Sequence, residues 1–368
     1  MYARSSEKND GSIGMDKNIT VATMQFKNDV KVSTTEYLKT YYTFKLGDIA
    51  FEGHQSKEFR YGRFVENDIG NGIVSHIFAV FRPIQEYDLY FWKYAINNET
   101  LMQRILARST KASTMMHDLV TNDFLNETFL VPSVKEQKQI GAFLNKLDNL
   151  ITLHQRKCEQ TKKMKKYMLQ KMFPQNGAKV PEIRFDGFTY DWEQRKLGDV
   201  FEQTSNLVNP KEDEIELWSL TVEDGLTKKS DRYNREFLVK KDDNFKEVRP
   251  GDIVYNPMNM TLGAVGYNGM AKSVAVSGYY TTMVAKENYD TYYINTWLKS
   301  PQAIRLYRTY ATGSLIEKQR VQFPTLSIIP VTFPKYEEQI KIGSYFHSID
   351  NLITLHQRQH KLHLNMLL

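Results

Sequence analysis

Histidine and cysteine are the side chains of this sequence best suited to metal or nucleophilic chemistry, and their spacing is informative. His356, His360 and His363 stand four and three residues apart, which places them on one face of a helix. His154 and Cys158 lie on the same face of an earlier copy of that segment. A cysteine nucleophile needs a neighbouring base and a cleft, which one helix face does not offer. We therefore interpret these residues as packing residues of a helix pair and predict neither a metal site nor a catalytic one.

Two further segments match catalytic motifs only in part. NPMN at 256–259 begins like the Asn/Asp-Pro-Pro-aromatic motif that holds a target amino group in amino-methyltransferases, but it lacks the second proline and the aromatic. GAVGYNGMAKS at 263–273 has glycines, a lysine and a serine without the spacing that binds phosphate. The sequence therefore predicts a non-catalytic chain.

The elements that carry these residues are duplicated. DNLITLHQR occurs at 148–156 and again at 350–358, and the same offset relates P-x-x-x-E-Q-x-x-I-G at 132–141 to its copy at 334–343. A slightly different offset relates LGDIAF at 46–51 to PGDIVY at 250–255. A nine-residue identity in a shared register is not a chance match. The chain is thus a tandem duplication of a unit of roughly 200 residues.

Each copy begins with a mixed part and ends in a long helix. Gly-Asp turns followed by β-branched and aromatic runs predict strands, and the apolar spacing of 90–108 and 291–310 predicts helices, so this part is α+β. From Lys135 to about Met172, apolar residues alternate three and four apart, which is typical of a coiled coil. Such a helix is about 55 Å long. Because neither helix can bury its stripe alone, we expect the two copies to form an antiparallel coiled coil. The predicted seam consists of Ile140, Leu144, Leu147, Ile151, His154 and Cys158 with Ile342, Phe346, Ile349, Ile353, His356 and His360.

Composition sets broad limits on the class of protein. A chain of 368 residues with 41% hydrophobic residues predicts two or more ordinary domains. The formal charge of +6 is compatible with a polyanionic partner but equally with an ordinary basic surface. A polar N-terminus, a single cysteine and the lack of a long apolar run favour a soluble protein of the reducing cytoplasm, without a membrane span.

Several segments together resemble one family. They are PEIRFDGFTYDWEQRKLGDVFE at 181–202, the GDI turns at 47–49 and 251–253, TGS at 312–314, and the closing block of each copy, at 132–156 and 334–358. The chain resembles the DNA-specificity subunits of type I restriction–modification enzymes over nearly its whole length. The resemblance implies a first target recognition domain at 1–131, a spacer helix at 132–173, a linker at 174–180, a second target recognition domain at 181–331 and a second helix at 332–368. Fewer residues precede the GDI turn in the first copy than in the second, and the second copy has no counterpart of MLQKMF at 168–173, so we expect a chain shortened at both ends.

The resemblance also implies a function and partners. Each recognition domain would read one half of a split site in double-stranded DNA. Two modification subunits that bind S-adenosylmethionine would methylate adenine, and restriction subunits would supply an ATP-driven motor and a nuclease with their Mg²⁺. No cofactor is expected on this chain itself. Two alternatives remain open: a vestigial or decoy subunit that occupies the methyltransferases without directing them, and a stand-alone DNA-binding repressor.

Candidate DNA contacts follow from the donors and acceptors that base edges and phosphates require. They lie in polar loops after the GDI strands, one strand later, and after the last helix. In the first domain they are His54, Gln55, Lys57, Arg60, Tyr61 and Arg63. In the second they are Asn256, Asn259, Thr261, Tyr279, Tyr280, Thr281, Gly313, Ser314, Lys318, Gln319 and Arg320.

Overall fold

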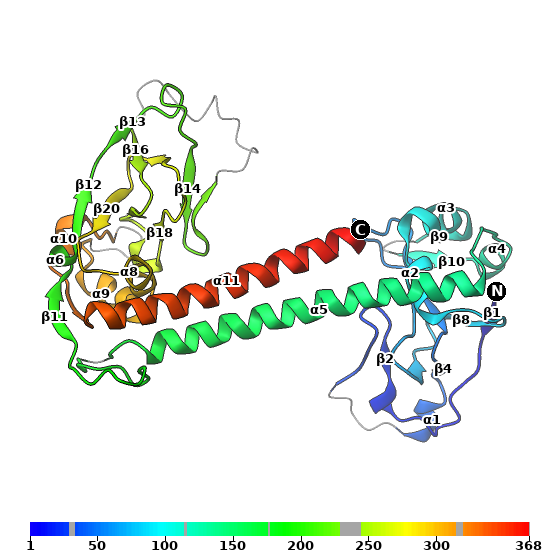
Figure 1. The fold of residues 1–368 in the computed structure, drawn as a ribbon. Helices are drawn as coiled ribbons and strands as arrows, with labels where there is room; N and C mark the ends of the chain where they lie inside the picture. The colour runs from blue at the N-terminus through cyan, green and yellow to red at the C-terminus, as the bar shows by residue number, and fades with distance from the viewer. Residues whose placement is uncertain (29–33, 114–115, 176, 229–243, 314–318, 368) are drawn as a thin grey trace. The chain divides into compact units, whose positions relative to one another are not determined.

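The computed structural model (Figure 1) describes residues 1–28, 34–113, 116–175, 177–228, 244–313 and 319–367. Contacts between Cα atoms divide the chain into two compact units. Unit 1 consists of Met1–Leu153 with His360–Leu368, and unit 2 consists of His154–Gln359. The long helices α5 (Val134–Lys171) and α11 (Tyr336–Leu367) therefore each contribute residues to both units.

Unit 1 contains short strands and short helices ahead of α5. Its elements are β1 (Tyr2–Ser5), η1 (Met15–Lys17), β2 (Ile19–Thr20), β3 (Gln25–Phe26), α1 (Thr35–Leu38), β4 (Tyr42–Phe44), β5 (Ile49–Glu52), β6 (Arg63–Glu66), β7 (Gly72–Val74), β8 (Ala79–Pro83), α2 (Leu89–Ala95), α3 (Glu99–Ser109), β9 (Thr110–Ala112), β10 (His117–Leu119) and α4 (Thr121–Leu125).

An antiparallel sheet in the order β1-β8-β5-β6 is the centre of unit 1. Successive side chains of β5 point to opposite faces of this sheet. Ile49 and Phe51 join a cluster with Trp92 of α2, whereas Ala50 joins a second cluster with Phe44 of β4. Helices thus cover one face, and the small β4–β7 and β2–β3 sheets cover the other.

Unit 2 is likewise built from short strands and short helices. Its elements are β11 (Glu193–Lys196), α6 (Leu197–Val200), β12 (Phe201–Thr204), β13 (Leu207–Val208), β14 (Trp218–Thr221), β15 (Gly225–Lys228), β16 (Phe245–Val248), β17 (Ile253–Tyr255), η2 (Met260–Leu262), β18 (Val265–Tyr267), β19 (Val274–Ser277), β20 (Thr281–Ala285), α8 (Thr291–Leu298), α9 (Pro301–Tyr310), α10 (Phe323–Ser327) and β21 (Pro330–Phe333).

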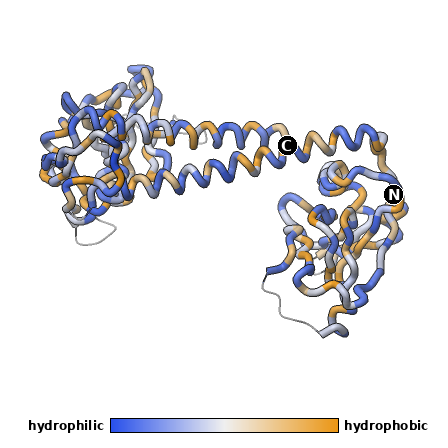
Figure 2. Tube along the Cα trace, turned by 60° about the horizontal axis from the view of Figure 1, so that its bottom comes forward, coloured by the Kyte–Doolittle hydropathy of each residue, from blue (hydrophilic) through white to orange (hydrophobic). Residues whose placement is uncertain are grey.

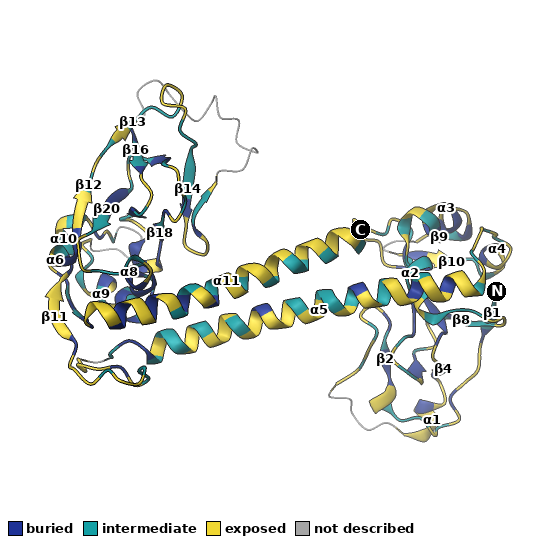
Figure 3. Cartoon of the chain, in the orientation of Figure 1, coloured by how far each residue is buried: buried dark blue, intermediate teal, exposed yellow. Residues whose placement is uncertain are grey.

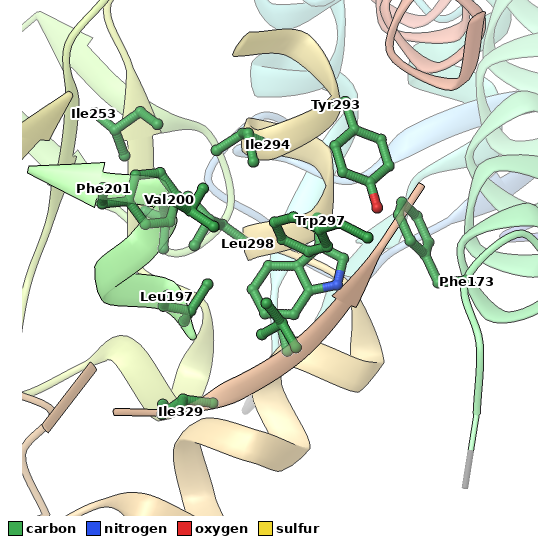
Figure 4. Packing of buried hydrophobic residues seen from close by; sticks show 14 of the residues in the cluster. Phe173, Leu197, Val200, Phe201, Ile253, Tyr293, Ile294, Trp297, Leu298 and Ile329 are labelled. Carbon is green, nitrogen blue, oxygen red and sulfur yellow. The ribbon is translucent and has the colours of Figure 1, made fainter. Parts of the chain in front are cut away.

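The two central sheets have the same topology. In unit 2 the order is β12-β20-β17-β18, and β12, β20, β17 and β18 take the places of β1, β8, β5 and β6. Ile253 and Tyr255 of β17 join the helix-side cluster, while Val254 joins the opposite cluster. Figure 4 shows part of the helix-side core, where Phe201 and Val200 pack near Ile294 of α8. The duplication of the sequence is therefore a duplication of the fold.

The predicted helices at 90–108 and 291–310 are each split into two. Asn98 caps α3 by accepting the Leu101 N–H at 3.0 Å. Ser300 caps α9 in the same way through Ala303, and Pro301 follows it. A capping residue has extended backbone angles, so the chain turns between the two helices. Apolar spacing alone did not detect these breaks.

Two long helices complete the chain: α5 (Val134–Lys171, 38 residues) and α11 (Tyr336–Leu367, 32 residues). Within unit 2 they run antiparallel, because His154 contacts His356 and Lys165 pairs with Asp350. Polar and apolar residues alternate along both helices (Figure 2). The buried residues of α11 lie in its first half, and its C-terminal turns are more exposed (Figure 3).

Candidate nucleic-acid interface

A set of hydrogen bonds made by Asp48 and Asn67, here called the bracket, holds the start of β5 in unit 1. The Asp48 carboxylate accepts the Lys45 N–H at 2.8 Å, and the Asp48 carbonyl accepts the Asn67 N–H at 2.8 Å. The Asn67 side chain donates to the carbonyls of Phe44 and Gly70, both at 2.9 Å. The Gly-Asp turn thus fixes the direction in which β5 leaves the bracket.

The same bracket occurs in unit 2 with the same atoms. The Asp252 carboxylate accepts the Arg249 N–H at 2.9 Å, and its carbonyl accepts the Asn268 N–H at 2.9 Å. The Asn268 amide donates to the Val248 and Lys272 carbonyls at 2.8 and 3.0 Å. Burial raises the pKa of Asp252. Both units therefore deliver a loop from the end of β5 or β17 in an equivalent way.

The loop after β5 presents polar side chains to solvent. His54, Gln55, Lys57 and Arg60 are exposed. Main-chain and side-chain bonds of Ser56 to Phe59 close the loop, at 3.0 Å each. These four side chains are available to bind an external group.

Tyr61 and Arg63 are more constrained than their neighbours. The Tyr61 ring packs edge-on against His117, with ring centroids 5.3 Å apart. Arg63 donates to Glu52 at 3.1 Å and to the Ala22 carbonyl at 2.7 Å. Both side chains therefore support the loop from within the domain.

A second element lies beside this loop. The His117 N–H donates to the Gly53 carbonyl at 2.8 Å, and Met116 forms a bridge with His54, so the β9–β10 hairpin extends along the loop. Lys111 of β9 and Ser113 are exposed on this hairpin. Sequence reasoning did not select them, although the offset of the repeat maps them onto the polar turn near Gly313.

Unit 2 brings its loop and its polar turn together in the same manner. The Val321 N–H donates to the Pro257 carbonyl at 2.9 Å. Thr312 and Arg320 exchange main-chain bonds at 3.0 and 2.9 Å, which places exposed Gly313 and half-buried Gln319 next to the 256–261 loop. Predicted Ser314 and Lys318 lie outside the described residues.

Some residues of the 256–261 loop form hydrogen bonds within unit 2 and are not free to bind DNA. Asn256 Oδ1 accepts the Met258 N–H at 3.0 Å, so this side chain shapes a turn. Thr261 is buried, and its carbonyl accepts a bond from Arg308 at 3.2 Å. Asn259 is exposed and remains available.

The β19–β20 turn carries the remaining predicted residues. Tyr279 is 90% exposed, whereas Tyr280 packs against an apolar cluster and Thr281 is buried. Lys246 donates to the Tyr280 carbonyl at 2.7 Å, and burial lowers the pKa of this lysine. Of the three residues, only Tyr279 presents its side chain fully to solvent.

Comparison with known proteins identifies the duplicated unit. The family model described as "Type I restriction modification DNA specificity domain" matches residues 3–163 and 190–365. The chain belongs to this family. A search of curated protein sequences gives no match.

A solved specificity subunit has the same fold. The type I restriction–modification S subunit from M. genitalium matches with a TM-score of 0.60 and 14% identity, covering 100% of this chain and 91% of that one. The HsdS subunit from Thermoanaerobacter tengcongensis also matches, with a TM-score of 0.45 and 15% identity, covering 100% of this chain and 95% of that one. The predicted fold, two tandem mixed domains with a long helix between them, is confirmed.

In this specificity chain, a glutamine of the closing block ties α5 to α2. Gln137 is buried; its Nε2 donates to the Pro132 carbonyl at 3.0 Å, and its Oε1 accepts the Asp88 N–H at 3.3 Å. The Asp88 carboxylate in turn accepts the Phe91 N–H at 2.8 Å and caps α2. We call this set of contacts the joint.

The joint is repeated in unit 2. Gln339 donates to the Pro334 carbonyl at 2.9 Å and accepts the Asp290 N–H at 3.1 Å, and Asp290 caps α8 through the Tyr293 N–H at 2.8 Å. A glycine follows each glutamine by four residues. At Gly343 an added Cβ would stand 2.7 Å from the Tyr293 nitrogen, which is why this position needs glycine.

The residues of the predicted seam have several environments. Leu147 and Cys158 are buried, and Ile140, Leu144, Ile151 and His154 are half-buried. In α11, Ile342, Phe346 and Ile349 belong to the core of unit 2, and Ile353 packs against it. His154 Nδ1 lies 3.3 Å from His356 Nδ1, while His360 is half-buried in unit 1.

Two further kinds of feature would bear on function: a group of metal-ligating side chains, and a helix that could cross a membrane. Within the described residues, no group of three or more His, Cys, Asp or Glu side chains could hold a metal ion. Among the helices that the structure describes, none is long and apolar enough to cross a membrane.

Proposed function

We propose that this chain is the DNA sequence-specificity subunit of a type I restriction–modification system, and that each unit reads one half of a bipartite target. The observation that carries the proposal is that, in each unit, a second pair of antiparallel segments lies against the loop that follows the bracketed strand: β9 with β10 in unit 1, and Thr312 with Arg320 in unit 2. Family membership supports DNA recognition as the role of these units.

The side chains of the two loops have the chemistry that base readout needs. In unit 1 the exposed set combines Gln55 and His54 with the cations Lys57 and Arg60. In unit 2 the exposed Asn259 and Arg320 lie with the half-buried Gln319. Amide and guanidinium groups form paired hydrogen bonds with adenine and guanine edges, and lysine binds phosphate. Because the two sets differ, the two half-sites differ as well.

The proposal extends to the partners. Modification subunits would bring S-adenosylmethionine and methylate adenine, and restriction subunits would bring ATP, Mg²⁺ and nuclease activity. This chain would direct them. Family membership supports this extension, because the family's description places the DNA specificity domain within type I restriction and modification.

The test is sequencing of methylated bases in cells that express this chain with its modification partner. We expect N6-methyladenine at one split motif with a fixed gap. Arg60→Ala should relax one half of the motif, and Gln319→Ala with Arg320→Ala should relax the other, with a loss of about 1–3 kcal/mol for a paired base contact. Lys39→Ala, an exposed change elsewhere in unit 1, is the matched control and should leave the motif unchanged.

Other outcomes would identify the alternatives. Stable association with the methyltransferase but no methylated motif would indicate a decoy subunit. Tight binding of the purified chain alone to a split site would indicate a repressor. Methyl transfer by the purified chain without a partner would contradict the non-catalytic assignment.

A further inference from the structure

Each unit holds one large apolar side chain out into solvent in a tight turn. The offset of the repeat pairs Ile77, between β7 and β8, with Tyr279, between β19 and β20. Ile77 is 75% exposed and Tyr279 is 90% exposed, more than any other large apolar side chain in the described part of the chain except Leu130. One exposed apolar residue needs no explanation, but two at equivalent places of a duplicated fold indicate a shared role.

The backbone of both turns is fixed. The Phe78 N–H donates to the Ser75 carbonyl at 3.1 Å, and the Tyr280 N–H donates to the Ser277 carbonyl at 3.0 Å. Phe78 and Tyr280 themselves pack against the apolar cluster on the face of the sheet that the helices do not cover. Each turn therefore anchors one residue in the domain and presents the residue before it to solvent.

The turns lie at the edge of each central sheet from which the loops with the predicted base contacts leave. The start of an antiparallel strand stands beside the end of its neighbour. In unit 1, Ala79 at the start of β8 is opposite Phe51 near the end of β5. In unit 2, Thr281 at the start of β20 is opposite Tyr255 at the end of β17. The exposed apolar residue and the polar loop of a unit therefore face the same side.

The polar groups at this edge indicate what the apolar side chain contacts. In unit 1 they include exposed Lys57 and Arg60, and in unit 2 they include exposed Asn259 and Arg320. DNA has an anionic backbone for the cations and stacked, apolar base faces for a side chain that enters between them. Proteins that insert one apolar side chain between base pairs combine these two contacts.

We propose that Ile77 and Tyr279 are wedge residues, each of which inserts partly between two base pairs at the half-site that its unit reads; this inference rests on the proposed DNA reading. A branched aliphatic side chain can separate a base step, and a tyrosine ring can stack on a base. Such a wedge favours steps that unstack easily, such as TA and CA. Each turn thus adds sequence preference without a hydrogen bond to a base.

The test uses the full chain in complex with its modification partner. The DNA is a set of duplexes that carry the split motif found by sequencing of methylated bases and differ only at bases that the motif leaves free. Potassium permanganate oxidises thymines that have lost their stacking, so it reports the step that a wedge opens. A thymine exposed by extrusion of the methylated adenine should react equally with all variants and marks the half-site.

We expect one further reactive step at each half-site. Ile77→Ala should reduce the reactivity of one step to that of free DNA, leave the other unchanged and weaken binding roughly tenfold. Tyr279→Ala should have the same effect on the other step. Ile77→Leu and Tyr279→Phe keep a large apolar side chain and should keep both signals.

Leu46→Ala and Ile328→Ala are the matched controls. Their side chains are 48% and 56% exposed. Leu46 precedes the start of β5, and Ile328 precedes Ile329, whose carbonyl accepts the Leu197 N–H ahead of β12. Both controls thus lie at the opposite edge of their sheets and should behave like the wild type. Equal circular dichroism of all variants excludes misfolding as the cause of any loss.

The outcomes separate this inference from the proposed function. A methylated motif without a further reactive step, or with steps that persist in Ile77→Ala and Tyr279→Ala, would overturn the inference and leave the proposed function standing. Release of the modification partner by either alanine change would show that the turn binds protein, and would equally overturn it. The absence of any motif would overturn both.

Discussion

Replacement of Gly141 by alanine tests whether the joint between α5 and α2 is as close-packed as the structure indicates. On helix propensity alone, alanine in a helix is more favourable than glycine by about 1 kcal/mol. A Cβ at Gly141, however, would stand 2.6 Å from the backbone nitrogen of Phe91 and would overlap the Asp88 carboxylate. The two effects have opposite signs, so their magnitudes decide the outcome.

The clash is the larger effect. The Phe91 nitrogen belongs to the first turn of α2, so it cannot move unless the helix moves, and overpacking of this kind costs about 1–3 kcal/mol. Displacement of the Asp88 carboxylate also removes the N-cap bond to Phe91, at a cost of about 1 kcal/mol. After subtraction of the gain in propensity, we expect Gly141→Ala to destabilise unit 1 by about 2 kcal/mol.

Hydrogen exchange with mass spectrometry measures this effect locally, which matters because a chain of two units need not unfold in one step. Peptides that cover α2 should lose about 2 kcal/mol of protection, while those of α8 should not change. Gly343→Ala should give the reverse pattern. Ser344→Ala is the matched control at an exposed neighbour of Gly343 and should change neither unit by more than about 0.5 kcal/mol. Stronger protection of α2 in Gly141→Ala would show that propensity dominates and would refute the packing argument.

Three further predictions concern stability. Leu147→Ala removes a side chain that is 4% exposed and should cost about 2–5 kcal/mol, as measured by urea unfolding. Gln137→Leu leaves the Asp88 N–H and the Pro132 carbonyl without a hydrogen-bond partner and should lower the stability of unit 1 by about 2 kcal/mol. Hydrogen exchange in α2 should then be faster. An unchanged exchange rate would show that water replaces the amide. Burial raises the pKa of Glu66 to about 9, so the folded chain holds this proton more tightly than the unfolded chain, whose value is 4.5. Stability from this group is complete below pH 4.5 and declines as the pH rises towards 9, so Glu66→Gln should stabilise unit 1 at pH 8 and have little effect at pH 4. Equal effects at both pH values would show that Glu66 ionises normally.

The repeat made the architecture predictable, because it is a property of the whole chain rather than of single residues. Nine identical residues predicted the duplicated fold, and the apolar spacing predicted helices whose bounds, Val134–Lys171 and Tyr336–Leu367, lie close to those expected. The breaks at Asn98 and Ser300 were not predicted, since an N-cap is a local hydrogen bond that an averaged apolar period does not register.

Contacts between distant segments could not be predicted from the sequence. Glu136 and Glu338 occupy the same place in the repeated motif, yet Glu136 is exposed and Glu338 is buried against Arg184 at 2.7 Å. The difference arises because the 181–192 segment covers this part of α11. For the same reason the partners of Gln137 could not be named: the carbonyl of Pro132 is local, but the N–H of Asp88 lies 49 residues away.

The joints and the loops differ in how many amino-acid substitutions they tolerate. In both joints the Gln Nε2 to Pro carbonyl distance is 3.0 or 2.9 Å, and in both the aspartate caps its helix at 2.8 Å, although Phe91 of one is Tyr293 of the other. In each joint the buried glutamine amide has two hydrogen-bond partners, and the glycine lies against a backbone nitrogen. Substitution at either position would therefore lose a hydrogen bond or cause a clash. The brackets hold the starts of β5 and β17, and exposed side chains in the loops after these strands, such as Arg60 and Asn259, can change without loss of fold. Under the proposed function, the joint sets how a domain is oriented on its helix and the loop sets which bases it reads. Substitutions in the joint should therefore affect the stability of a unit, and substitutions at Arg60 or Arg320 should affect sequence preference alone.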